Sequence, residues 1–103
     1  MSKDPAALRR ELDDLSRRLD ARTREFRRNG EFSDVHEALM NDIRNRHDQL
    51  RTKVDASVRE GRSWDLVKTE FIRDYSSMFD DLLQFEERLD ADEGARQEAR
   101  PSS

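Results

Sequence analysis

The stretch that decides the fold runs from Trp64 to Leu89 and reads WDLVKTEFIRDYSSMFDDLLQFEERL. Its apolar residues recur at intervals of three and four, the spacing that places side chains on one face of an α-helix. They are Trp64, Val67, Phe71, Tyr75, Met78, Leu82, Phe85 and Leu89. The apolar and polar residues do not alternate as they do in a half-buried strand. The stretch therefore predicts a long amphipathic helix over about 64–91.

The same stretch carries a second apolar stripe, formed by Ile72, Phe79 and Leu83 at steps of seven and four. At 100° per residue the two stripes together cover roughly 160° of the helix circumference. A helix with so wide an apolar face needs two neighbours. In a monomer these are the other helices of the chain, whereas in a dimer one can belong to another copy. We therefore take Ile72, Phe79 and Leu83, with Met40 adjacent, as the candidate interaction surface.

Two further helices are predicted upstream, over about 5–28 and 34–60, because each carries its own apolar stripe at helical spacing. The stripe in the first consists of Leu8, Leu12, Leu15, Leu19 and Phe26. The stripe in the second consists of Val35, Leu39, Ile43, Leu50, Val54 and Val58.

Local signals mark the ends of these helices. Gly30 and Gly61 follow the first two apolar patterns, and glycine accepts the left-handed conformation that closes a helix. Ser33 and Ser63 can each accept a main-chain N–H at the start of the next helix. Over 92–103 the apolar pattern stops, so we expect a disordered charged tail after a single three-helix domain at 1–91.

Three helices of similar length with short connections predict an all-α fold, an antiparallel up-down-up three-helix bundle of coiled-coil-like type that can also self-associate. Charge agrees with this arrangement. Residues 5–28 hold eight arginines and five acidic residues, a net charge of +3, whereas 64–91 hold eight acidic and three basic residues, a net charge of −5. The first and third helices are parallel neighbours in such a bundle, and their opposite charges favour contact.

Composition restricts the class of protein. The chain has 103 residues, no cysteine and a net charge of −4. The lack of cysteine excludes disulfides and thiolate metal sites and fits a reducing compartment. The sequence MSKDP at the start does not resemble a signal peptide, and no apolar run approaches the ~20 residues that span a bilayer. We expect a cytoplasmic protein, and the negative charge disfavours general adhesion to nucleic acid or to an anionic membrane.

The two histidines, His36 and His47, both lie on the apolar side of the predicted second helix. They are three turns apart, a rise of roughly 16 Å, which is too far for both to bind one metal ion. Neither has a second ligand at helical spacing. The sequence therefore predicts no metal site.

Partners for the histidines follow from the predicted hairpin of the second and third helices. If it folds about 61–62, His36 lies level with Glu86, and His47 lies level with Tyr75. We therefore predict two buried polar pairs, His36–Glu86 and His47–Tyr75. These groups can be satisfied polar residues at the edge of the core, or part of a pH-sensitive element, because histidine titrates near neutrality. A ligand pocket near His47 and Tyr75 is a further alternative.

The first helix also carries a basic ridge opposite its leucines. Arg10, Arg17, Arg24 and Arg28 fall within about 40° of one another at 100° per residue. Seventeen of the twenty basic residues are arginine, which suits anion binding but also fits a GC-rich bacterial genome. No aromatic residue lies between these arginines, so a platform for stacking single-stranded nucleic acid is not indicated.

The sequence contains no Gly-rich phosphate loop and no Gly-x-Ser-x-Gly motif, and its adjacent acidic residues point about 100° apart on a helix. We expect a non-enzymatic bundle without a cofactor or a small-molecule ligand. Its expected role is association with another protein or with itself. The alternative is a nucleic-acid-associated regulator that uses the arginine ridge.

Overall fold

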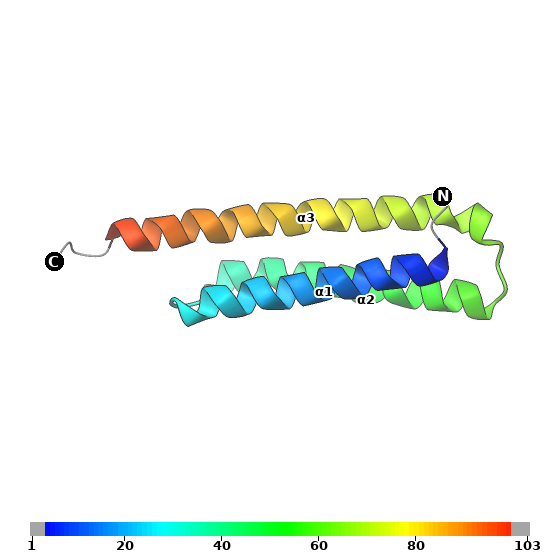
Figure 1. Cartoon of the computed structure of the whole chain (residues 1–103), viewed down its shortest axis with the longest axis horizontal. Helices are drawn as coiled ribbons and strands as arrows, with labels where there is room; N and C mark the ends of the chain where they lie inside the picture. The colour runs from blue at the N-terminus through cyan, green and yellow to red at the C-terminus, as the bar shows by residue number, and fades with distance from the viewer. Residues whose placement is uncertain (1–3, 100–103) are drawn as a thin grey trace.

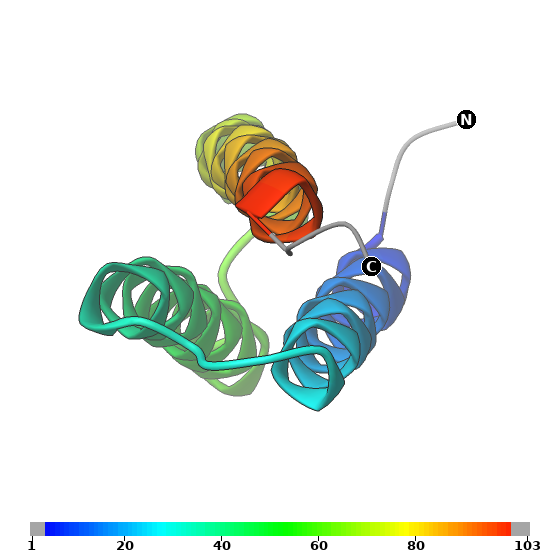
Figure 2. The ribbon, with the colours of Figure 1, turned by 90° about the vertical axis from the view of Figure 1, so that its left-hand side faces the viewer.

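The computed structural model describes residues 4–99 of the chain, and within this range it is all-helical. It consists of α1 (Pro5–Arg28), α2 (Asp34–Arg59) and α3 (Trp64–Ala99). The α1–α2 connection lies at one end of the elongated molecule, and the α2–α3 connection lies at the other (Figure 1). Viewed end-on, the helices form a triangle in which each packs against both others (Figure 2).

The first two helices begin at side-chain caps, Asp4 for α1 and the predicted Ser33 for α2. Asp4 accepts the main-chain N–H of Ala7 through a side-chain oxygen at 2.7 Å, and Pro5 occupies the first helical turn. Proline is favoured there because the first N–H groups of a helix have no partner within the helix. Ser33 accepts the N–H of His36 at 3.2 Å. These bonds satisfy donors that would otherwise depend on water.

The end of α2 is closed by Gly61, as the sequence predicts. Gly61 has φ of +68°, a left-handed conformation that side chains rarely adopt. Its N–H donates to the carbonyl of Val58, and the N–H of Arg62 donates to the carbonyl of Ser57. This pair of bonds is the Schellman motif, which satisfies the last carbonyls of a helix and turns the chain towards α3.

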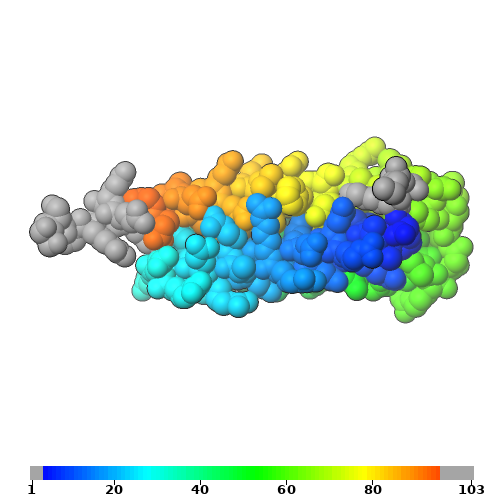
Figure 3. Space-filling view, in the orientation of Figure 1, coloured from blue at the N-terminus to red at the C-terminus, as the bar shows by residue number. Residues whose placement is uncertain are grey.

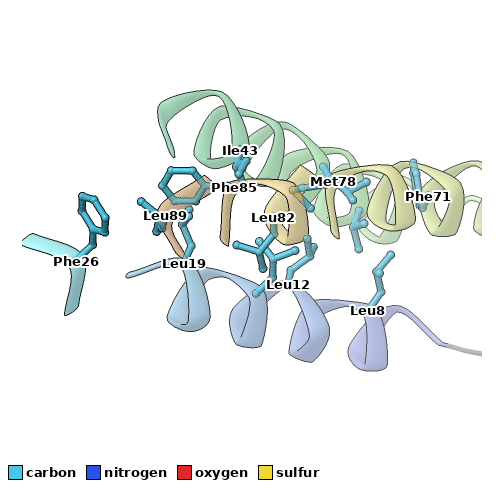
Figure 4. Packing of buried hydrophobic residues seen from close by; sticks show 13 residues of the cluster. Leu8, Leu12, Leu19, Phe26, Ile43, Phe71, Met78, Leu82, Phe85 and Leu89 are labelled. Carbon is cyan, nitrogen blue, oxygen red and sulfur yellow. The ribbon is translucent and has the colours of Figure 1, made fainter. Parts of the chain in front are cut away.

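A single apolar core runs between the three helices (Figure 4). The stripe predicted for α1 is buried in full, and Thr23 fills the gap in it with 5% of its surface exposed. Helix α3 contributes the five most buried members of its predicted stripe. The core cluster consists of Leu8, Leu12, Leu15, Leu19, Phe26, Ile43, Leu50, Val54, Phe71, Met78, Leu82, Phe85 and Leu89.

The stripe predicted for α2 is only half correct. Ile43, Leu50 and Val54 are buried, but the outer members Val35, Leu39 and Val58 are 50%, 40% and 43% exposed. The reason is geometric. Each step of four residues turns the helix by 400°, so the stripe advances about 40° around the helix per step and leaves the core at both ends. His36 and Ser57, both buried, take the places nearest the core there.

Helix α3 extends beyond the end that the sequence predicts. The disordered tail expected over 92–103 is helical over 92–99, and 100–103 lie outside the described residues. Gly94 does not break the helix, because its neighbours alanine, glutamate, arginine and glutamine are strong helix formers and one interior glycine costs only about 1 kcal/mol. In Figure 1 this last part of α3 projects past the α1–α2 connection.

No helix within residues 4–99 is both long enough and apolar enough to cross a membrane.

We expect Leu82→Ala to lower the free energy of unfolding by about 2–5 kcal/mol, because Leu82 is fully buried where the helices meet and its truncation leaves a cavity. Leu66→Ala is the matched control, since Leu66 lies on the same helix but is 85% exposed, and should change stability by less than about 0.5 kcal/mol. Urea denaturation followed by circular dichroism measures both. Equal effects of the two substitutions would contradict this core.

Candidate functional site

His36 lies at the end of the bundle that carries the α1–α2 connection, in contact with the aromatic rings at that end of the core. Its ring centroid is 4.8 Å from that of Phe26 and 5.3 Å from that of Phe32. Phe32 in turn makes an edge contact with Phe85 of α3 at 6.4 Å. Only 5% of the surface of His36 is exposed, so both of its ring nitrogens need partners inside the protein.

Two elements supply these partners. The main-chain N–H of Ser33 donates to Nδ1 of His36 at 3.2 Å, so His36 and Ser33 cap the start of α2 reciprocally. Nε2 of His36 lies 2.6 Å from a carboxylate oxygen of Asp92 on α3. The neutral tautomer with its proton on Nε2 satisfies both contacts, since it accepts at one nitrogen and donates from the other. His36 thus ties α3 to the α1–α2 connection.

The carboxylate of Asp92 is stabilised in its ionised form. The hydrogen bond from His36 lowers the pKa of Asp92 below its usual value, and Arg88, four residues earlier, lowers it further by donating from Nε at 3.0 Å. A carboxylate that accepts hydrogen bonds in its charged form resists protonation. This tether explains why the helix is ordered at 92, where the apolar pattern predicts that it ends.

The predicted His36–Glu86 pair is therefore wrong. His36 lies opposite Asp92, roughly one and a half helical turns further along α3 than a hairpin folded about 61–62 would place it. Arg46 likewise pairs with Asp81. The hairpin of α2 and α3 therefore folds at a later residue than predicted, so each residue of α2 faces a later residue of α3 than expected.

Glu86 instead forms the main link between α1 and α3, which lie against each other along the side drawn in Figure 3. Arg18 donates to both of its carboxylate oxygens, at 2.6 and 2.8 Å, and Nε of Arg22 lies 3.4 Å away. Arg22 also donates to Asp90 at 2.5 Å. The bond to Glu86 raises the pKa of Arg18. A nearly buried carboxylate is tolerated here because two guanidinium groups face it.

The structure does not bring His47 and Tyr75 together as a hydrogen-bonded pair. Nε2 of His47 lies 3.0 Å from the main-chain carbonyl of Leu12, which can only accept, and Nδ1 lies 3.0 Å from Asp48. Tyr75 stacks on Phe79 at the α1 side of α3. Burial, with the nearby carboxylates of Glu11 and Asp14, raises the pKa of Tyr75.

The candidate interaction surface does not form one free patch. Met40 and Phe79 pack against the core cluster, and Ile72 is half-buried. The guanidinium of Arg18 on α1 lies over the ring of Phe79, 5.5 Å from its centroid. Leu83 alone is exposed, at 37%. Helix α1 therefore covers Phe79 of the second stripe but leaves Leu83 exposed.

A different apolar surface lies between α2 and α3. A groove of about 270 Å³ is lined by buried Ile43 and Phe85 and by the exposed side chain of Leu39. Its polar rim consists of Asp42, Asp81, Gln84 and Arg88. Sequence reasoning missed this site because it assigned Leu39 to the core. The rotation of the α2 stripe around the helix, about 40° per step of four residues, could have indicated that Leu39 lies outside the core.

The arginine ridge is present on the outer face of α1. Arg10, Arg17, Arg24 and Arg28 are all exposed. Among the described residues only Arg17 of these four forms an ion pair, with Asp14 at 3.8 Å. A second open hollow, of about 550 Å³, is lined by Arg9, Arg51, Thr52, Asp55 and Arg59. Asp55 and Asp13 pair with Arg9 and Arg51 there, so this hollow has little net positive charge.

No protein-family model, curated protein or solved structure matches the chain. Within the described part of the chain, no three histidine, aspartate or glutamate side chains are grouped so that they could hold a metal ion.

We expect Asp92→Asn to lower the free energy of unfolding by about 1 kcal/mol at neutral pH, because a charged acceptor at a partly exposed position becomes a neutral one. The pKa of Asp92 is lower in the folded chain than in the unfolded chain. Its contribution to stability is therefore present above the unfolded pKa and is lost as the pH falls through the folded pKa. Urea titrations at neutral pH and below about pH 3 should show the difference from the parent shrinking.

Glu87→Gln is the control for that measurement, because Glu87 is exposed on the same helix and forms no ion pair with another described residue. It should leave stability nearly unchanged at both pH values. A loss in Asp92→Asn that is the same at both pH values would contradict the tether between His36 and Asp92.

Proposed function

We propose that this chain is a non-enzymatic helical bundle that acts by associating with another protein, and that the groove between α2 and α3 is its contact surface. The observation that carries the proposal is Leu39, an exposed leucine at the wall of a groove whose floor is the buried pair Ile43 and Phe85. Val35 lies one turn before Leu39 on α2 and is half exposed, so the apolar surface continues along the helix. Apolar surface that is contiguous and has a polar rim is typical of protein contact sites.

We further infer that the bundle is antiparallel, up-down-up and coiled-coil-like. The numbers of the residues paired between α1 and α2 have a constant sum (Arg9–Asp55, Asp13–Arg51 and Asp20–Arg44), which supports opposite directions. Those paired between α1 and α3 have a constant difference (Arg18–Glu86 and Arg22–Asp90), which supports a common direction. Alternating steps of four and three, as in Leu8, Leu12, Leu15 and Leu19, are the spacing of a coiled-coil seam.

Nucleic-acid binding through the arginine ridge is the second candidate. The exposure of Arg10, Arg17, Arg24 and Arg28 favours it, because these side chains could reach phosphates. The net charge of −4 opposes long-range attraction to a polyanion, and the ridge lacks aromatic residues. The absence of cysteine fits action in the cytoplasm, which we propose as the site of association.

We expect Leu39→Glu to abolish co-purification of the partner from the protein's own organism, because a carboxylate in the wall of the groove must be desolvated on binding. The variant should keep its fold, since Leu39 is 40% exposed, and circular dichroism checks this. Leu66→Glu is the matched control at the other end of the bundle, 85% exposed and remote from the groove, and should retain the partner.

Reversal of the ridge in Arg17→Glu/Arg24→Glu should likewise leave partner binding intact. Association through the groove is refuted if Leu39→Glu retains the same partner as the parent. If the partner is lost only in the ridge variant, the contact surface is the outer face of α1 and not the groove.

A further inference from the structure

We propose that the groove between α2 and α3 receives a basic amphipathic helix of a partner protein, with aliphatic residues towards the groove and lysine or arginine at its flanks. This inference rests on the proposed function, and it adds the chemistry of the partner. Its basis is the shape of the groove, the charge of its rim and the character of the other faces of this chain.

The shape of the groove suits a helix. Leu39 forms its wall above Ile43 and Phe85, and Val35 extends the apolar surface along α2. Val35 and Leu39 follow each other along α2, which runs beside α3 along the length of the bundle (Figures 1 and 2). A helix that presents apolar residues at steps of three and four is the usual occupant of such a groove.

The charge of the rim selects a cationic partner. Asp42 lines the groove, and among the described residues it forms no ion pair. Asp80 and Glu87 are exposed and come directly before the lining residues Asp81 and Arg88 in the sequence. The two cations of this region are already engaged, Arg46 by Asp81 and Arg88 by Asp92. The rim therefore has an excess of negative charge, which favours lysine or arginine on the partner.

A second copy of this chain fits the groove poorly. Two grooves facing each other across a two-fold axis would bring acidic rims together, which costs binding energy. Within residues 4–95 the strongly basic face is the ridge on α1. Between Arg17 and Arg24 that face exposes nothing more apolar than Ala21. Such a face satisfies the charge of the rim but cannot fill the groove, which leaves a separate protein as the occupant.

Two designed peptides test this inference. Each is about five helical turns, roughly 18 residues, with the same leucines at steps of three and four. One has lysine at the flanking positions, and the other has glutamate there. We expect fluorescence anisotropy at low ionic strength to show that the parent chain binds the lysine peptide at least about ten times more tightly than the glutamate peptide. Leu39→Glu should abolish binding, and Leu66→Glu should not.

The decisive variant is Asp42→Lys/Glu87→Lys, which reverses the rim charge of Asp42 and the exposed charge of Glu87 next to Arg88. Neither residue forms an ion pair with another described residue. It should reverse the preference, so that the glutamate peptide binds more tightly. Equal binding of the two peptides, no binding of either, or a preference that persists in the charge-reversed variant would overturn the inference. Such a result would not affect co-purification that depends on Leu39. The proposed function and the inference about the partner's charge are therefore tested independently.

Light scattering after size-exclusion chromatography tests whether a second copy of this chain, rather than a partner protein, occupies the groove. A parent chain that is monomeric, and remains so in Leu39→Glu, supports a separate partner. A dimer that dissociates in Leu39→Glu and is displaced by neither peptide would assign the groove to a second copy and overturn the inference.

Discussion

The structure depends on helix α3 burying apolar residues against two neighbours at once. Phe85 and Met78 face α2 and the core, while Phe79 and Glu86 face α1, so neither neighbour alone can cover the helix. Side chains of all three helices meet in one core (Figure 4), and each helix packs against both others. Packing of this kind stabilises the three helices as a unit, because removal of one exposes the others.

Polar contacts determine how the helices are aligned along that core. Single ion pairs at an exposed surface contribute little stability, but here they form regular sets, such as Arg18–Glu86 and Arg22–Asp90, that fit only one register. His36 has a different effect. Because it is buried and bonded to both Ser33 and Asp92, it fixes the end of α3 to the start of α2. The same bonds hold α3 beside Leu39, so the end tether also sets one wall of the groove.

Much of the fold could be predicted from the sequence, because helix ends and core positions follow local rules. Asp4, Ser33 and Gly61 act where the capping rules place them, and the α1 leucines are all buried. The α2–α3 register could not be predicted, since it depends on the geometry of the connection. A shift of roughly one and a half turns replaced Glu86 by Asp92 as the partner of His36. The groove was missed for a related reason: spacing by four residues predicts a helical face but overlooks its slow rotation around the helix.

Native-state hydrogen exchange of the Leu12→Ala variant tests most directly whether the three helices share one core. Leu12 lies on α1 and is fully buried, so its truncation should weaken the whole bundle. The account predicts that the slowest-exchanging amides around Leu50 on α2 and Leu82 on α3 accelerate by the same factor as those of α1. Acceleration confined to α1, with α2 and α3 as protected as in the parent chain, would contradict it.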